Sequence, residues 1–224
     1  MTLNARAWLA LAIVAGVMCA LIFGVAGTMR YWQAWVYLGI YVAVSIPTMR
    51  YLVRKDPALL ERRMRGGPMF EKECTQRIIM TFTSLGFIAL LVLPALDRRF
   101  GWSSVPVWTV VLGDVLVAMG YYFILLVYRV NSYSASTIQV VPGQAVISTG
   151  PYAIVRHPMY ASGSLYIFGT PLALGSYWGF VAIATMMPFL LWRLLDEERI
   201  LTRELPGYAD YRRRVRHRLV PMVW

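Results

Sequence analysis

Residues 150–160 read Gly-Pro-Tyr-Ala-Ile-Val-Arg-His-Pro-Met-Tyr and lie between two hydrophobic blocks. Gly-Pro predicts a turn, because glycine tolerates a positive φ and proline fixes its own φ. Pro158 disfavours the α conformation at His157 and favours a helix that starts at or just after the proline. The stretch therefore places Arg156, His157 and two tyrosines at a helix N-terminus, where free N–H groups and the helix dipole favour anions.

The same residues would also suit an anchor at the membrane surface. Arg156 would then lie on lipid headgroups, and the two tyrosines would belong to the aromatic belt of the bilayer interface. The spacing alone leaves both interpretations open.

The composition favours a membrane protein over a soluble one. Of the 224 residues, 58% are hydrophobic and only 15% are charged, whereas soluble domains carry about 25% charged residues. The formal net charge is +11, and the basic residues, nearly all arginine, cluster in the gaps between apolar runs. We therefore expect anionic lipid headgroups as their partners, and no nucleic acid.

The two cysteines predict neither a disulfide nor a metal site. Cys19 lies midway along the first apolar run and Cys74 lies in a charged segment, so they are expected at different depths. No Cys/His pattern has the spacing of a metal site.

The apolar runs predict an all-α, polytopic integral-membrane helical bundle of about six spans. The first run, Trp8–Gly27, is too long for the core of a signal peptide and indicates a retained transmembrane helix. The two last runs are short and suggest a tight hairpin. The expected spans are 7–29, 33–51, 78–96, 105–130, 160–174 and 177–195.

We divide the chain into residues 1–130, with four spans and a basic segment at 54–77, and residues 131–224, which are expected to carry the functional site. The basic residues concentrate in segment 54–77 and in the C-terminal tail, which predicts that both segments and both termini are cytoplasmic. In segment 54–77, Asp56 and Pro57 indicate the start of a short helix, and the rest is interpreted as a solvated loop on the membrane surface.

Two further groups of charged residues are candidate functional residues. Arg193 and Glu197 are four apart and share a helix face, whereas Glu198 points away by about 100°. They form either a simple surface ion pair or a site in which a half-buried arginine has a specific anionic partner. Asp114, near the middle of the fourth span, is either functional or protonated and hydrogen-bonded between helices.

The C-terminal part of the chain resembles the isoprenylcysteine carboxyl methyltransferase family of integral-membrane enzymes. The resemblance covers about 90 residues, and the combination of motifs in this order is specific. The motifs are Gln144 to Tyr152, Arg156 to Tyr160, Arg193, Glu197-Glu198, Tyr208, Tyr211 and Arg218 to Pro221.

The resemblance implies methyl transfer from S-adenosylmethionine at a cytoplasmic pocket formed by the 131–160 loop and the C-terminal helix. Glu197 would hold the polar end of the methionine moiety, and Arg193 would face the reacting group of the substrate. Glu198, or alternatively Asp114, is the candidate base if the acceptor needs deprotonation. The other expected cofactor-binding residues are Gln144, Ala145, Val146, Ile147, Gly150, Tyr152, Arg156, His157, Pro158, Met159 and Tyr160.

The resemblance implies a lipid-soluble or lipidated acceptor, first of all a carboxylate, in a protein of the bacterial inner (cytoplasmic) membrane. Three alternatives stay open: N-methylation of a phospholipid or another amine, an NADPH-dependent membrane reductase of the sterol-reductase type, and a membrane scaffold without activity. Met159 and the paired glutamates favour the methyltransferase over the reductase.

Overall fold

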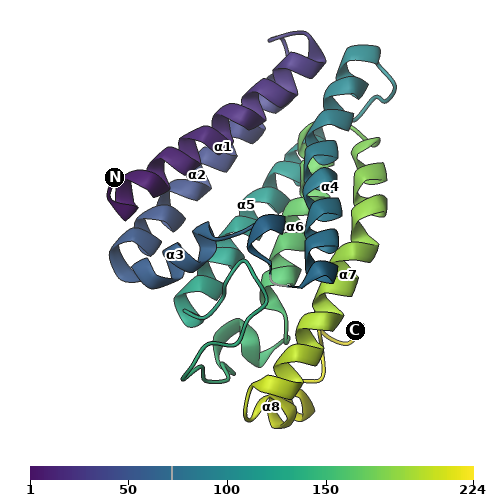
Figure 1. Cartoon of the computed structure of the whole chain (residues 1–224). Helices are drawn as coiled ribbons and strands as arrows, with labels where there is room; N and C mark the ends of the chain where they lie inside the picture. Colours follow the sequence, from purple (N-terminus) through teal and green to yellow (C-terminus); the bar gives the residue numbers. More distant parts are fainter. Residues whose placement is uncertain (72) are drawn as a thin grey trace.

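The computed structural model describes residues 1–71 and 73–224 as a bundle of helices (Figure 1). Lys72, one of the basic residues of segment 54–77, lies outside the described residues. No strand occurs in the described part of the chain, and the predicted all-α bundle is confirmed. The helices are α1 (Leu3–Ala26), α2 (Trp32–Lys55), α3 (Pro57–Met64), α4 (Cys74–Phe100), α5 (Val107–Val130), α6 (Pro158–Ala173), α7 (Gly179–Glu204) and α8 (Tyr208–Arg214), with short 3₁₀ turns η1 (Pro68–Phe70) and η2 (Gly150–Ala153).

Five helices, α1, α2, α4, α5 and α7, are long and apolar enough to cross a membrane. The two shorter spans expected at 160–174 and 177–195 correspond to α6 and α7, but they differ in length. With 16 residues, α6 is about 24 Å long, which is less than the ~30 Å hydrocarbon core. In contrast, α7 continues for 26 residues and carries the charged groups of the site on its last turns.

Glycines bring the backbones of α5 and α6 into contact. A Cβ atom at Gly113 would lie 2.2 Å from the Ala173 nitrogen, and one at Gly169 would lie 2.8 Å from the Gly113 oxygen. At Gly120, a Cβ atom would lie 2.8 Å from the Tyr166 nitrogen. Small residues allow this close approach in membranes, where packing and not the hydrophobic effect joins helices. This close packing holds α6 in place along α5. The first residues of α6 belong to the candidate active site described below.

Replacing Gly113 with alanine is expected to lower the free energy of unfolding by about 1–3 kcal/mol, because the added methyl group must push the backbones apart. Thermal unfolding in detergent measures the change. The control is Gly16→Ala in α1, where an added Cβ atom would have no other atom within 4 Å. Equal melting temperatures for the two variants would contradict the close packing of α5 on α6.

Segment 54–77 is more ordered than the sequence analysis expected. The Asp56 side chain caps α3 by accepting a hydrogen bond from the Leu59 nitrogen at 2.9 Å, which confirms the predicted helix start. The remaining expectation, a solvated loop, is wrong. Leu59 and Leu60 are buried in one cluster with Leu52 and Tyr128, and Glu71 is only 3% exposed. The apolar face of α3 and the ion pair of Glu71 described below hold this segment against the bundle.

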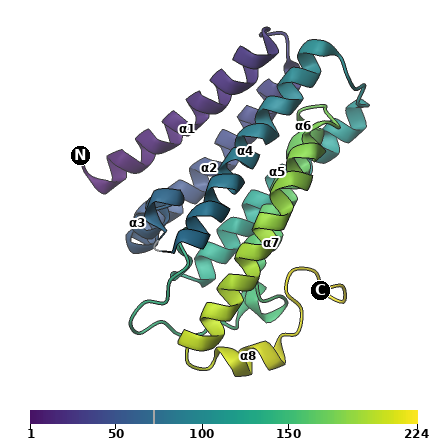
Figure 2. The same ribbon diagram turned by 45° about the vertical axis from the view of Figure 1, so that its right-hand side comes forward.

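The two arginine-rich segments lie at the same end of the bundle. Figures 1 and 2 show α3, α8 and the connection between α5 and α6 at one end, with the α1–α2 and α4–α5 turns at the other. The site described next is at the end that carries α3 and α8.

Candidate active site

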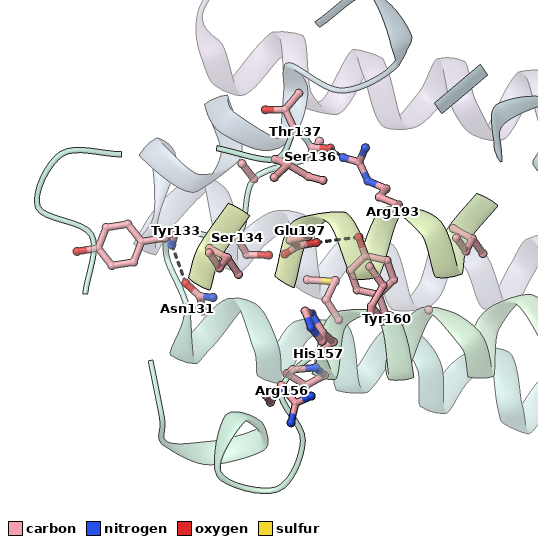
Figure 3. Close-up of a pocket in the computed structure, with 18 of the residues that line it drawn as sticks. Asn131, Tyr133, Ser134, Ser136, Thr137, Arg156, His157, Tyr160, Arg193 and Glu197 are labelled. Atoms are coloured by element: carbon pink, nitrogen blue, oxygen red, sulfur yellow. Dashed lines mark hydrogen bonds between the residues drawn. The ribbon is translucent and has the colours of Figure 1, made fainter. Parts of the chain in front are cut away.

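A pocket of about 350 Å³ lies between the 131–149 loop, the start of α6, the last turns of α7 and α8. Figure 3 shows polar side chains of the lining that come from the 131–149 loop, the start of α6 and α7, which are far apart in sequence. Pockets for small molecules commonly have volumes of about 300–1,000 Å³. The volume is therefore that of a ligand site rather than of a packing defect.

Most of the site residues expected from the sequence line this one pocket. The exceptions are Gly150 and Glu198. Gly150 has φ +57°, so it supplies the left-handed turn that the Gly-Pro pair predicts. The expected residues in the lining are Gln144, Ala145, Val146, Ile147, Tyr152, Arg156, His157, Pro158, Met159, Tyr160, Arg193 and Glu197.

Three buried polar atoms of the lining have no hydrogen-bond partner among the described residues. They are the Tyr208 hydroxyl, Thr83 Oγ1 and His157 Nε2, the last of which lies 3.9 Å from Glu198 Oε1. Burial raises the pKa of Tyr208 above its ordinary value, so the phenol stays protonated at neutral pH and offers a donor. Buried polar groups are normally paired, because an unpaired one is costly. Their grouping in one pocket indicates a polar ligand.

Glu197 is the acidic group of the pocket. The Tyr160 hydroxyl donates a hydrogen bond of 2.8 Å to Glu197 Oε2 (Figure 3). Across residues 1–71 and 73–224, no basic side chain forms a salt bridge with Glu197. A half-buried carboxylate in this situation is complementary to a cationic ligand.

Arg193 lines the pocket from α7 but does not pair with Glu197. Its Nη2 donates to Glu71 Oε1 at 2.7 Å and to the Ser136 carbonyl at 2.9 Å. Its Nη1 donates to Gln76 Oε1 at 2.8 Å. The anionic partner of this buried arginine is therefore Glu71, and the expected role of Arg193 toward the substrate stays a prediction.

Glu198 lies behind the pocket and joins two arginines. Its Oε1 accepts from Arg156 Nε at 2.6 Å, and its Oε2 accepts from Arg218 Nε at 2.9 Å. Figure 3 shows Arg156 pointing away from Glu197 and Tyr160. Glu198 and Arg156 are thus paired with each other in this structure, and their expected roles as a base and as a cofactor ligand stay predictions.

The C-terminal tail is attached to the motif at residues 156–158. The Arg156 and His157 nitrogens donate to the His217 and Arg218 carbonyls at 2.9 and 3.0 Å. The Arg156 guanidinium adds bonds to two carbonyls of the tail. This backbone pairing, together with Glu198, fixes His157 at the start of α6.

The 131–149 loop supplies pocket residues that the sequence analysis did not name. Arg63 Nη1 donates to the Ala135 carbonyl at 3.1 Å, and Ser136 Oγ donates to the Arg63 carbonyl at 2.9 Å. Asn131 Nδ2 donates to the Tyr152 hydroxyl at 2.7 Å. Burial raises the pKa of Tyr152 to about 12, so its phenol is neutral. The polar, turn-rich composition of residues 131–149 predicted a loop. No pattern in its sequence indicated which of its residues face the pocket.

Asp114 is buried on α5 and lines neither this pocket nor the groove described below. Its Oδ1 has no hydrogen-bond partner within the described residues.

A comparison with protein families identifies residues 108–207 as a match to the phospholipid methyltransferase model. This region is similar to the phospholipid methyltransferase family. The match begins in α5 and ends before α8, so it contains the motif at 156–160 together with Arg193 and Glu197. No curated protein matches the chain.

The family confirms the resemblance to membrane methyltransferases and favours this activity over the reductase alternative. It does not determine the acceptor, because isoprenylcysteine-type and phospholipid acceptors are both consistent with it. Parts of the pocket come from outside the phospholipid methyltransferase match, namely Arg63, Met80, Thr83, Phe87, Tyr208, Tyr211 and Leu219.

Proposed function

We propose that the protein transfers a methyl group from S-adenosylmethionine to a lipophilic acceptor taken from the membrane, with a carboxylate as the leading acceptor class. The observation that carries the proposal is a polar pocket that adjoins an apolar groove. The two cavities share four lining residues, Pro158, Ser164, Met187 and Leu219. A polar donor and a lipophilic acceptor would meet at this junction.

The residues of the pocket fit S-adenosylmethionine. Glu197 suits its cationic groups, and Arg63 suits its carboxylate, since Arg63 forms no salt bridge with a described residue. His157 Nε2 and the Tyr208 hydroxyl would hydrogen-bond its remaining polar groups. When bound, this cofactor supplies an activated methyl group on a sulfonium.

The groove fits the hydrocarbon part of an acceptor. It has a volume of about 980 Å³ and runs between α5, α6 and the C-terminal tail. Its lining is almost wholly apolar, with Phe123, Leu165 and Phe168 among its members. At the depth of a membrane-spanning bundle, a lipid chain can enter such a groove from the side without crossing water.

The chain's own residues would orient the acceptor and exclude water. A carboxylate is ionised at pH 7 and needs no general base. Arg193, held by its three partners, would align the carboxylate, and alignment of two reactants supplies a large share of the rate. Met187 and Leu219 would keep water away from the junction.

The ion pair between Glu71 and Arg193 favours a second acceptor class, the amine of a phospholipid headgroup. Glu71 neutralises the charge of Arg193, which weakens Arg193 as a binding site for an anion. Glu197, without a cationic partner among the described residues, would attract an ammonium group.

We further propose that the end with α3 and α8 faces the cytoplasm, because it carries most of the basic residues. A cytoplasmic pocket would have access to a soluble methyl donor.

The test is a methylation assay with purified protein in vesicles made from a membrane lipid extract, using S-adenosylmethionine with a deuterated methyl group. We expect mass spectrometry to find the label in the lipid fraction. Mild alkali removes the label from a methyl ester but not from an N-methyl group, so it separates the two acceptor classes. Absence both of labelled lipid and of calorimetric S-adenosylmethionine binding would refute the proposal.

A further inference from the structure

The guanidinium of Arg193 is held by residues from the first half of the chain. Glu71, which lies between η1 and α4, pairs with Arg193 Nη2 at 2.7 Å, and its side chain is only 2% exposed. Gln76, on the first turn of α4, accepts from Nη1 at 2.8 Å. Both residues lie outside the region that matches the methyltransferase family.

The hydrogen bonds of Glu71, Gln76 and the Ser136 carbonyl hold the guanidinium of Arg193 in one orientation. Gln76 Nε2 donates to Asp196 Oδ2, so Gln76 Oε1 is the atom that accepts from Arg193. Glu71 is itself held in place, because its carbonyl accepts from Arg77 Nε at 2.9 Å. The two terminal nitrogens of Arg193 are thus fixed by three groups from two separate segments.

The pairing also changes the electrostatic character of the pocket. An unpaired guanidinium in a partly buried site would repel a cation over several ångströms, because screening there is weak. With Glu71 beside it, the pair is neutral, so Arg193 adds no net positive charge to the part of the pocket where Glu197 lies. The surroundings of Glu197 are then complementary to a sulfonium cation.

We infer that Glu71 is a positioning residue of the active site that compensates the charge of Arg193, so that the pocket binds a cationic methyl donor. The inference rests on the proposed function, because it assumes that S-adenosylmethionine occupies the pocket. It extends the site into the half of the chain that the family match does not cover.

The test compares the binding of two ligands to Glu71→Gln by calorimetry. S-adenosylmethionine carries a sulfonium, and S-adenosylhomocysteine has a neutral thioether but the same adenosine and amino-acid groups. Glutamine keeps the size of the side chain and an acceptor oxygen for Arg193. We expect the Kd for S-adenosylmethionine to rise about tenfold more than the Kd for S-adenosylhomocysteine, from the loss of one nearby charge. A purely structural role would weaken both ligands alike.

Two further variants complete the test. Glu61→Gln removes an exposed acid of the same segment, whose side chain is 57% exposed, and should leave both Kd values unchanged. The double variant Glu71→Gln/Arg193→Gln removes both charges and should restore the ratio of the two Kd values.

An unchanged ratio in Glu71→Gln, with normal binding to the wild-type protein, would overturn the inference alone. Failure of the wild-type protein to bind either ligand would overturn the proposed function and the inference with it.

Discussion

Glu198→Ala is expected to lower the free energy of unfolding by about 3–5 kcal/mol, because removing one partner of a buried ion pair leaves an uncompensated charge. Arg156, with a side chain only 5% exposed, would lose its carboxylate, and Arg218 would lose the bond that holds the tail. Thermal and denaturant unfolding in detergent would measure the loss.

The matched control is Glu204→Ala at the end of the same helix. The Glu204 side chain is 43% exposed and pairs with an exposed arginine, and such pairs contribute about 0–1 kcal/mol. A Glu198→Ala protein with wild-type stability but no methyl transfer would contradict the structural role and support the catalytic role expected from the sequence.

Glu197→Gln is expected to weaken S-adenosylmethionine binding by about 10–100-fold, since a charge-assisted hydrogen bond contributes about 1.5–3 kcal/mol. Glutamine fills the same space and still accepts from the Tyr160 hydroxyl, so stability should change little. Calorimetric titration with S-adenosylmethionine measures the effect.

Tyr160→Phe separates the contribution of the Tyr160–Glu197 hydrogen bond from the contribution of the Glu197 charge. It removes the hydrogen bond to Glu197 but keeps the charge, so it should weaken binding by much less than Glu197→Gln. Wild-type affinity in Glu197→Gln would show that the cationic part of the ligand is bound elsewhere. The two neighbouring glutamates are thus expected to differ in what they support. Glu197→Gln should lose ligand binding, whereas Glu198→Ala should lose stability.

Local rules predicted the parts of the fold that depend on neighbouring residues. Pro158 starts α6 and Asp56 caps α3, because backbone restriction and side-chain capping act within one helical turn. The apolar runs predicted the long helices, since each must satisfy its own backbone groups in the membrane. The motif at residues 156–160 and its partners on α7 also meet in one pocket, as the sequence analysis expected.

The partners of charged side chains could not be predicted. Glu71 and Arg193 are 122 positions apart, and nothing in the basic segment 54–77 distinguishes Glu71 from its exposed neighbours. Helical periodicity separated Glu197 from Glu198, but it could not tell which of them faces the pocket. That depends on Arg218, which reaches Glu198 only because the tail folds back along residues 156–157.

The contact between the backbones of α5 and α6 isolates the site from changes in the bilayer. Because the glycines leave no space between these helices, a thicker or thinner membrane can tilt the pair but cannot slide one helix along the other. His157, directly before α6, and Tyr160 on α6 would then keep their distance from the end of α5 in membranes of different lipid composition. Adaptation to lipid thickness would fall instead on α1, which is the least enclosed of the long helices.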